Sequence, residues 1–120
     1  DSLQAALREG EEEICVNRTV LNVLGTLSDF FVVPSNFLVT PVIATIRKEP
    51  IFKPDAYEVA RILHGSIEDL IREDAIREKE ILAAGKFRMM APHFDIDGEV
   101  VWGATAMMLN EFRMVLKEIL

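Results

Sequence analysis

The sequence predicts one domain of the α/β (α+β) class, in which helices flank a mixed β-sheet. An amphipathic helical pattern covers residues 2–14, β-like runs rich in Val, Leu and Thr follow between residues 19 and 46, and an apolar helical pattern covers residues 104–119. Helices and strands that alternate in this way are typical of a sheet covered by helices. The 120 residues have the length of one domain, 1–120.

Composition and charge narrow the classes of function. The net charge is −7 and the Lys and Arg residues are dispersed, which argues against a nucleic-acid surface. A nucleotide ligand stays open, because a bound divalent metal reverses the local charge. No apolar run is long enough to span a membrane. Cys15 is the only cysteine, which fits a reducing compartment, and we expect a cytoplasmic location.

The first half of the chain predicts a helix followed by strands. The helix covers Ser2–Ile14, where Leu3, Leu7, Gly10 and Ile14 recur at helical spacing. Strands are predicted over 19–27, extended by 30–33, and over 37–46 after a turn. The 37–46 run is almost continuously apolar, which favours a central strand covered on both faces. Pro41 within it donates no ladder hydrogen bond and indicates an edge or a bulge.

The second half predicts shorter elements and a terminal helix. Residues 58–64 are compatible with a short strand, and a capping-box pattern beginning at Ser66 opens a short helix through about residue 72. The charged run 74–82 gives no clear prediction. Asp97-Gly98 lies between apolar runs and predicts a hairpin. The last helix is expected to bury Met108, Phe112, Val115 and Ile119.

The stretch Arg8-Glu9-Gly10-Glu11-Glu12-Glu13-Ile14 carries candidate chemistry. Glu9, Glu12 and Glu13 stand at i, i+3 and i+4, so a helix places three carboxylates on one face. They repel one another, and the helix dipole disfavours anions near its C-terminus. A hard divalent cation would relieve this repulsion, and Arg8 can hold the Glu12 carboxylate in place. By charge alone, the run is also typical of a solvated acidic face.

The order of these residues is similar to the second half of the Nudix box, Arg-Glu-apolar-x-Glu-Glu-x-Gly-apolar. The matching residues are Arg8, Glu9, Glu12, Glu13 and Val16. Gly10 stands where the box has an apolar residue, and Cys15 stands where it has the Gly that ends the helix. The first Glu and Gly of the box would precede Asp1. The resemblance therefore implies the C-terminal part of a Nudix domain, whose strands before the box are missing here.

Four later segments resemble the coenzyme A diphosphatase branch of this family, in the same order. They are Leu24–Leu27, Val39–Val42, Tyr57–Val59 and Val101–Ala106. The resemblance thus covers nearly the whole chain. It implies a Nudix-type α/β/α sandwich and a hydrolase that cleaves the pyrophosphate bond of a nucleoside diphosphate derivative, such as coenzyme A or a related nucleotide.

The resemblance also implies a site. Mg²⁺ or Mn²⁺ would be bound by Glu9, Glu12 and Glu13, with Arg8 and Glu12 among the catalytic residues. Glu58 is a candidate for a further metal ligand or a general base, and its simpler interpretation is an exposed carboxylate at a strand end.

Other interpretations of the function and of the site stay open. The substrate could be ADP-ribose or another nucleotide sugar, or the fragment could be inactive or only bind a ligand. If strands are missing, apolar residues from 37–46 should be exposed or covered by another chain, as in a homodimer. A metal triad of His93, Asp95 and Asp97 is a weaker alternative, because Asp97 fits the hairpin turn and His93 is expected to be structural.

Overall fold

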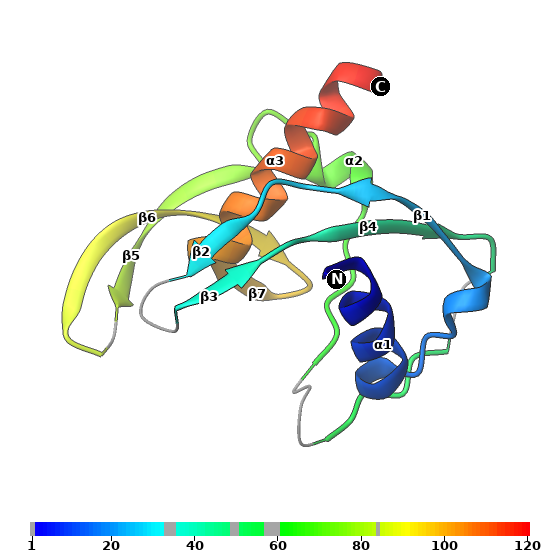
Figure 1. Cartoon of the computed structure of the whole chain (residues 1–120). Helices are drawn as coiled ribbons and strands as arrows, with labels where there is room; N and C mark the ends of the chain where they lie inside the picture. Colours follow the sequence, from blue (N-terminus) through cyan, green and yellow to red (C-terminus); the bar gives the residue numbers. More distant parts are fainter. Residues whose placement is uncertain (1, 33–35, 49–50, 57–60, 84) are drawn as a thin grey trace. The chain divides into compact units, whose positions relative to one another are not determined.

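The computed structural model describes residues 2–32, 36–48, 51–56, 61–83 and 85–120, and it divides the chain into two compact units, 1–62 and 63–120 (Figure 1). The described ranges contain three α-helices and three small sheets. This confirms the predicted mixture of helices and strands. The ladders in these ranges are all antiparallel, so the mixed sheet that the sequence predicts is not seen there.

Unit 1 opens with helix α1 (Ser2–Ile14), over the residues that the apolar spacing predicts. The stripe residues Leu3, Leu7 and Ile14 are half-buried. The helix ends at Cys15, which adopts a left-handed φ of 60°, and the Val16 N–H donates to the Gly10 carbonyl at 3.2 Å. A 3₁₀ turn, η1 (Arg18–Val20), then leads into the first strand.

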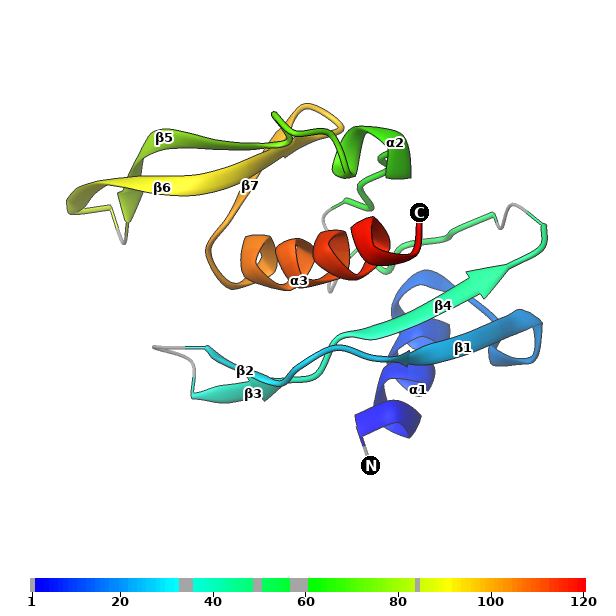
Figure 2. The same cartoon turned by 90° about the horizontal axis from the view of Figure 1, so that it is seen from above.

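Four strands of unit 1 form one bent antiparallel ribbon (Figure 2). β1 (Leu21–Thr26) pairs with β4 (Val42–Ile46), and β2 (Phe30–Val32) pairs with β3 (Phe37–Val39). These strands lie within the predicted runs. In the described part of the chain β4 pairs with β1 alone, so the central strand expected over 37–46 is wrong there.

Pro41 explains why the predicted 37–46 strand is divided into β3 and β4. It lies between the two strands, where its missing N–H removes no ladder hydrogen bond. Its carbonyl still accepts from the Leu27 N–H at 2.9 Å, which links the two ladders. The predicted irregularity at this residue is therefore confirmed.

The ribbon exposes large apolar side chains. A two-stranded ribbon has too few neighbours to bury both of its faces. Phe37 and Leu38 are 69% and 63% exposed, which confirms the expectation of exposed apolar residues within 37–46. Their cross-strand neighbour Phe31, which pairs with Leu38, is also exposed.

Unit 2 begins with an irregular segment and a short helix. Residues 61–64 form no strand, so the strand predicted over 58–64 is wrong in this part, and residues 58–60 lie outside the described ranges. Helix α2 (Ile67–Leu70) starts where the capping pattern predicts, because the Ser66 hydroxyl accepts from the Asp69 N–H at 3.1 Å. It is shorter than expected.

A three-stranded antiparallel sheet forms the centre of unit 2, in the order β5-β6-β7. The strands are β5 (Ile76–Ala83), β6 (Phe87–Ile96) and β7 (Glu99–Trp102). β6 and β7 form the predicted hairpin, and Asp97 and Gly98 turn the chain with φ values of 53° and 80°. The charged run 74–82 mostly becomes β5, because pairing with β6 decides its structure.

Helix α3 (Gly103–Ile119) packs on β6 and β7, and Phe94, Val101 and Ala106 form the core of this unit. The helix lies where the sequence predicts, but its buried face is different. The buried α3 residues are Ala106, Arg113 and Leu116.

The predicted buried face of α3 is wrong for its C-terminal half. Val115 and Ile119 are 44% and 72% exposed, and Met108 and Phe112 are half-buried. Two apolar stripes at helical spacing compete on this helix. The buried stripe includes Arg113, and the hydrogen bonds of that side chain make its burial favourable.

Candidate functional site

The acidic face of α1 is the candidate site that the sequence predicts. Glu9, Glu12 and Glu13 all lie within this continuous α-helix, so helix geometry gives them a common face. Glu9 and Glu12 are exposed and Glu13 is half-buried. The predicted contact of Arg8 with Glu12 is present, with 4.0 Å between Nε and Oε1 and side chains that are 61% and 65% exposed. At such exposure the pair contributes about 0.3–0.5 kcal/mol.

Glu11 belongs to a different contact. Its carboxylate accepts a hydrogen bond from Nε of Arg18, which follows the helix, and Nη1 of Arg18 also donates to Gln4 at 3.3 Å. This ion pair is thus made by the acidic residue that stands outside the ligand positions of the motif. The sequence did not predict this contact, because it depends on the turn after the helix.

The C-terminal end of α1 is held by a segment far along the chain. The Lys53 N–H donates to the Ile14 carbonyl at 3.1 Å, and the Asp55 N–H donates to the Glu13 carbonyl at 2.6 Å. The last carbonyls of a helix have no partner within the helix, so these bonds satisfy two of them. The last turn, which carries Glu12 and Glu13, is therefore held by hydrogen bonds from residues outside the helix.

The carboxylates of α1 are the candidate ligands of a divalent metal ion. Within the described ranges, no group of three or more His, Cys, Asp or Glu side chains is arranged to hold a metal ion. The donor set of α1 consists of carboxylates, which are the ligand type that Mg²⁺ and Mn²⁺ prefer. Glu58, the further candidate ligand or base, lies outside the described residues.

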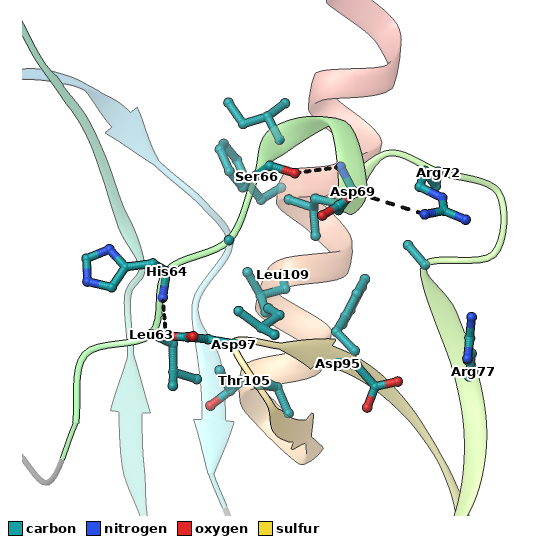
Figure 3. A pocket seen from close by; sticks show the side chains of 18 of the residues that line it. Leu63, His64, Ser66, Asp69, Arg72, Arg77, Asp95, Asp97, Thr105 and Leu109 are labelled. Carbon is teal, nitrogen blue, oxygen red and sulfur yellow. Dashed lines mark hydrogen bonds and ion pairs between the residues drawn. The ribbon is translucent and has the colours of Figure 1, made fainter.

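Unit 2 contains a cavity of about 770 Å³ that sequence reasoning missed (Figure 3). Its lining comes from the 63–66 segment, α2, the 72–77 segment, β6, β7 and α3. The lining segments are far apart in the sequence and carry no common motif, so no sequence signal marks the cavity.

One side of this cavity carries an ordered network of charges. Asp74 is 3.1 Å from Nε of Arg72 and 3.8 Å from Nη2 of Arg77. At the opposite end, the Asp97 carboxylate accepts from the backbone N–H of His64 at 3.2 Å (Figure 3). Four carboxylates and two guanidinium groups line the cavity, and the two Arg side chains are engaged by Asp74.

Arg113 fixes the loop that carries this network. Its Nε donates to the Leu70 carbonyl at 2.9 Å and its Nη2 donates to the Arg72 carbonyl at 2.8 Å. Lys117, one turn later on α3, pairs with Glu73 at 3.1 Å. Arg113 and Lys117 of α3 thus hold the 70–73 loop. Apolar periodicity could not predict these contacts, because both residues are charged.

The alternative triad of His93, Asp95 and Asp97 does not form a metal group in the described structure. His93 is buried at 5% exposure, with its Nε2 at 3.5 Å from Oδ1 of Asp95. Asp97 occupies the hairpin turn, as predicted. The burial of His93 agrees with the structural role that the sequence suggested for it.

Comparison of the chain with protein-family models finds no match, and no curated protein matches it. None of the helices in the described ranges combines the length and the apolar composition needed to cross a bilayer.

Proposed function

We propose that this chain is the C-terminal part of a Nudix-type hydrolase domain, with an α/β/α sandwich fold when the domain is whole. The reaction is hydrolysis of the pyrophosphate bond of a nucleoside diphosphate derivative, and coenzyme A or a related nucleotide is the first candidate substrate. Water adds to one phosphorus and the bond from that phosphorus to the bridging oxygen breaks. With coenzyme A, the products are 3′,5′-ADP and a phosphopantetheine.

The observation that carries the proposal is the match between α1 and the motif. The helix spans the motif and gives Glu9, Glu12 and Glu13 a common face. It ends at Cys15, the position where the Nudix box has Gly, and this residue adopts the left-handed φ of 60° that Gly favours. A left-handed backbone at the position of the Gly in the motif supports the resemblance independently of the carboxylates.

The residues of the chain have distinct roles in this proposal. Glu9, Glu12 and Glu13 would hold Mg²⁺ or Mn²⁺, and Arg8 would orient the Glu12 carboxylate. A metal bound there would supply positive charge against the diphosphate and would orient the attacking water. A carboxylate removes a proton from that water, and Glu12 and Glu58 are the candidates for this base.

The proposal is tested by Glu12→Gln and Glu13→Gln in the full-length protein, assayed on coenzyme A and on ADP-ribose with Mg²⁺ or Mn²⁺. Each substitution keeps side-chain size and removes one negative charge. We expect each to lower the rate by about 100-fold or more, because charge stabilisation by the metal contributes several kcal/mol and each ~1.4 kcal/mol is tenfold in rate. Stability without metal should hold or rise slightly, because helix repulsion decreases.

Glu11→Gln is the matched control, because its carboxylate contacts Arg18 and lies outside the ligand positions. Equal activity of all three variants and the wild type would contradict the metal site. A loss of activity in Glu11→Gln as large as in Glu12→Gln and Glu13→Gln would show that the effect is not specific to the proposed ligand positions. Preference for ADP-ribose over coenzyme A would select the nucleotide-sugar alternative. A homodimer and a cytoplasmic location remain predictions from the sequence.

A further inference from the structure

We propose that the cavity of unit 2 binds an organic cation with an apolar body, such as an alkyl or aryl amine. The cavity is lined by described residues between 63 and 112, and its volume is about 770 Å³. Small-molecule sites typically have volumes of about 300–1,000 Å³, with mostly apolar walls and a few polar groups that orient the ligand. The inference is independent of the hydrolase proposed for α1, because it concerns other residues and another kind of ligand.

The floor of the cavity is apolar. Phe94 and Val101 belong to the buried core of the unit, and they also line the cavity. Ile96 and Leu109 pack against this core and are part of the lining as well. An alkyl or aryl group that covers such a floor removes apolar surface from water, which favours binding. The affinity should therefore increase with the length of the apolar chain.

Small residues leave the space above this floor open. The lining includes Gly65, Ser66, Ala75 and Thr105, whose side chains are too short to fill it. An added Cβ at Gly65 would lie 3.2 Å from Cγ2 of Ile96, so the segment before α2 approaches β6 closely at this point. This close approach gives the cavity a well-packed wall, while the short side chains keep its interior unfilled.

The charged groups of the lining are unevenly distributed. Among the described lining residues, four carboxylates stand against two guanidinium groups. Both guanidinium groups contact Asp74 and lie on one side of the cavity, whereas Asp97 and His64 lie on the other side (Figure 3). The Asp97 carboxylate accepts from the His64 backbone N–H at 3.2 Å. A carboxylate has about four acceptor positions, so Asp97 can also accept from an ammonium group.

This arrangement favours an organic cation over a metal ion or an anion. Three or more His, Cys, Asp or Glu side chains placed to hold a metal ion are not found in the described part of the chain, so the carboxylates of the cavity do not converge on one point. An anion would face an excess of carboxylates. A single ammonium group needs only one carboxylate, and the apolar floor accommodates the rest of the molecule.

The experiment compares octylamine, 1-octanol and octanoate, which have the same chain length, as probes of the full-length protein by NMR titration. We expect octylamine to bind about three- to tenfold more tightly than octanol, because its ammonium group adds a charge-assisted hydrogen bond, and octanoate to bind more weakly than octanol. Hexylamine should bind about tenfold more weakly than octylamine, because it buries two fewer CH₂ groups. No binding of octylamine, equal affinity of the three probes or preference for octanoate would overturn the proposal.

A pair of phenylalanine variants tests whether the probes occupy this cavity. Thr105→Phe fills the cavity from α3, whereas Met107→Phe places the same ring at an exposed position of the same helix that is not among the lining residues. We expect Thr105→Phe to weaken the binding of octylamine and octanol about tenfold or more, because a filled cavity excludes both chains. Met107→Phe should leave both affinities within about twofold of the wild type. Unchanged octanol affinity in Thr105→Phe would place the probes elsewhere and overturn the proposal.

A pair of amide variants tests the contact with the ammonium group, and it decides the question alone if Thr105→Phe does not fold. Asp97→Asn keeps an oxygen that can accept from the His64 N–H, and asparagine tolerates the left-handed backbone of this turn. It should abolish the advantage of octylamine over octanol and leave octanol within about twofold of the wild type. Glu68→Gln removes a charge on α2 outside the lining and should preserve this advantage. An advantage that persists in Asp97→Asn, or that is lost equally in Glu68→Gln, would overturn the proposal.

Discussion

Cys15→Gly should stabilise the protein, because Cys15 adopts a backbone conformation that glycine favours. Its φ is 60° and its side chain is exposed, so the substitution relieves strain without removing a buried group. A left-handed conformation costs a non-glycine residue about 1–2 kcal/mol. Glycine loses about 0.5–1 kcal/mol more backbone entropy on folding. The difference leaves a net gain of about 0.7 kcal/mol.

The effect should be visible in thermal and urea unfolding followed by circular dichroism. For 120 residues, the unfolding entropy is about 0.25 kcal/mol/K, so a gain of ~0.7 kcal/mol raises the midpoint by about 3 °C. Cys15→Ala is the control, since it removes the thiol and keeps the strain. It should leave stability within about 0.3 kcal/mol of the wild type. Equal stability of the Gly and Ala variants would refute the strain argument.

Two further predictions concern unit 2. Arg113→Met should destabilise the protein by about 2–4 kcal/mol in urea unfolding, because it removes two hydrogen bonds from a buried guanidinium to the Leu70 and Arg72 carbonyls. A loss below about 0.5 kcal/mol would show that water replaces these bonds. Gly98→Ala should cost about 0.5–1 kcal/mol, because φ is 80° while an added Cβ meets nothing within 4 Å. An unchanged urea midpoint would contradict the assigned hairpin turn.

The elements that the sequence predicted well are those with a strong local signal. The apolar stripe of Ser2–Ile14 predicted α1, Ser66 predicted the start of α2, and Asp97-Gly98 predicted the β6–β7 hairpin. In each case the deciding interactions lie within a few residues of one another. Pro41 belongs to the same group, because a missing N–H restricts a strand in any environment.

The elements that were missed depend on contacts between distant residues. β5 is a charged run with weak strand propensity, and its pairing with β6 determines its structure. The buried face of α3 follows from Arg113, which reaches carbonyls of a loop some 40 residues earlier. A hydrophobic stripe could not predict a buried arginine, because its burial depends on acceptors that only the folded chain brings near.

The acidic face of α1 combines repulsion between neighbouring carboxylates with stabilising contacts from residues farther along the chain. The spacing of its carboxylates could be read from the sequence, and so could the repulsion between them. The nearby cations offset this repulsion only in part, since Arg18 pairs with Glu11 and Arg8 reaches Glu12 only at 4.0 Å. The backbone of residues 53–55 stabilises the end of the helix without neutralising any carboxylate. These backbone contacts hold the turn in place and leave the charge of its carboxylates unchanged, so the proposed metal site is tested by metal affinity rather than by stability.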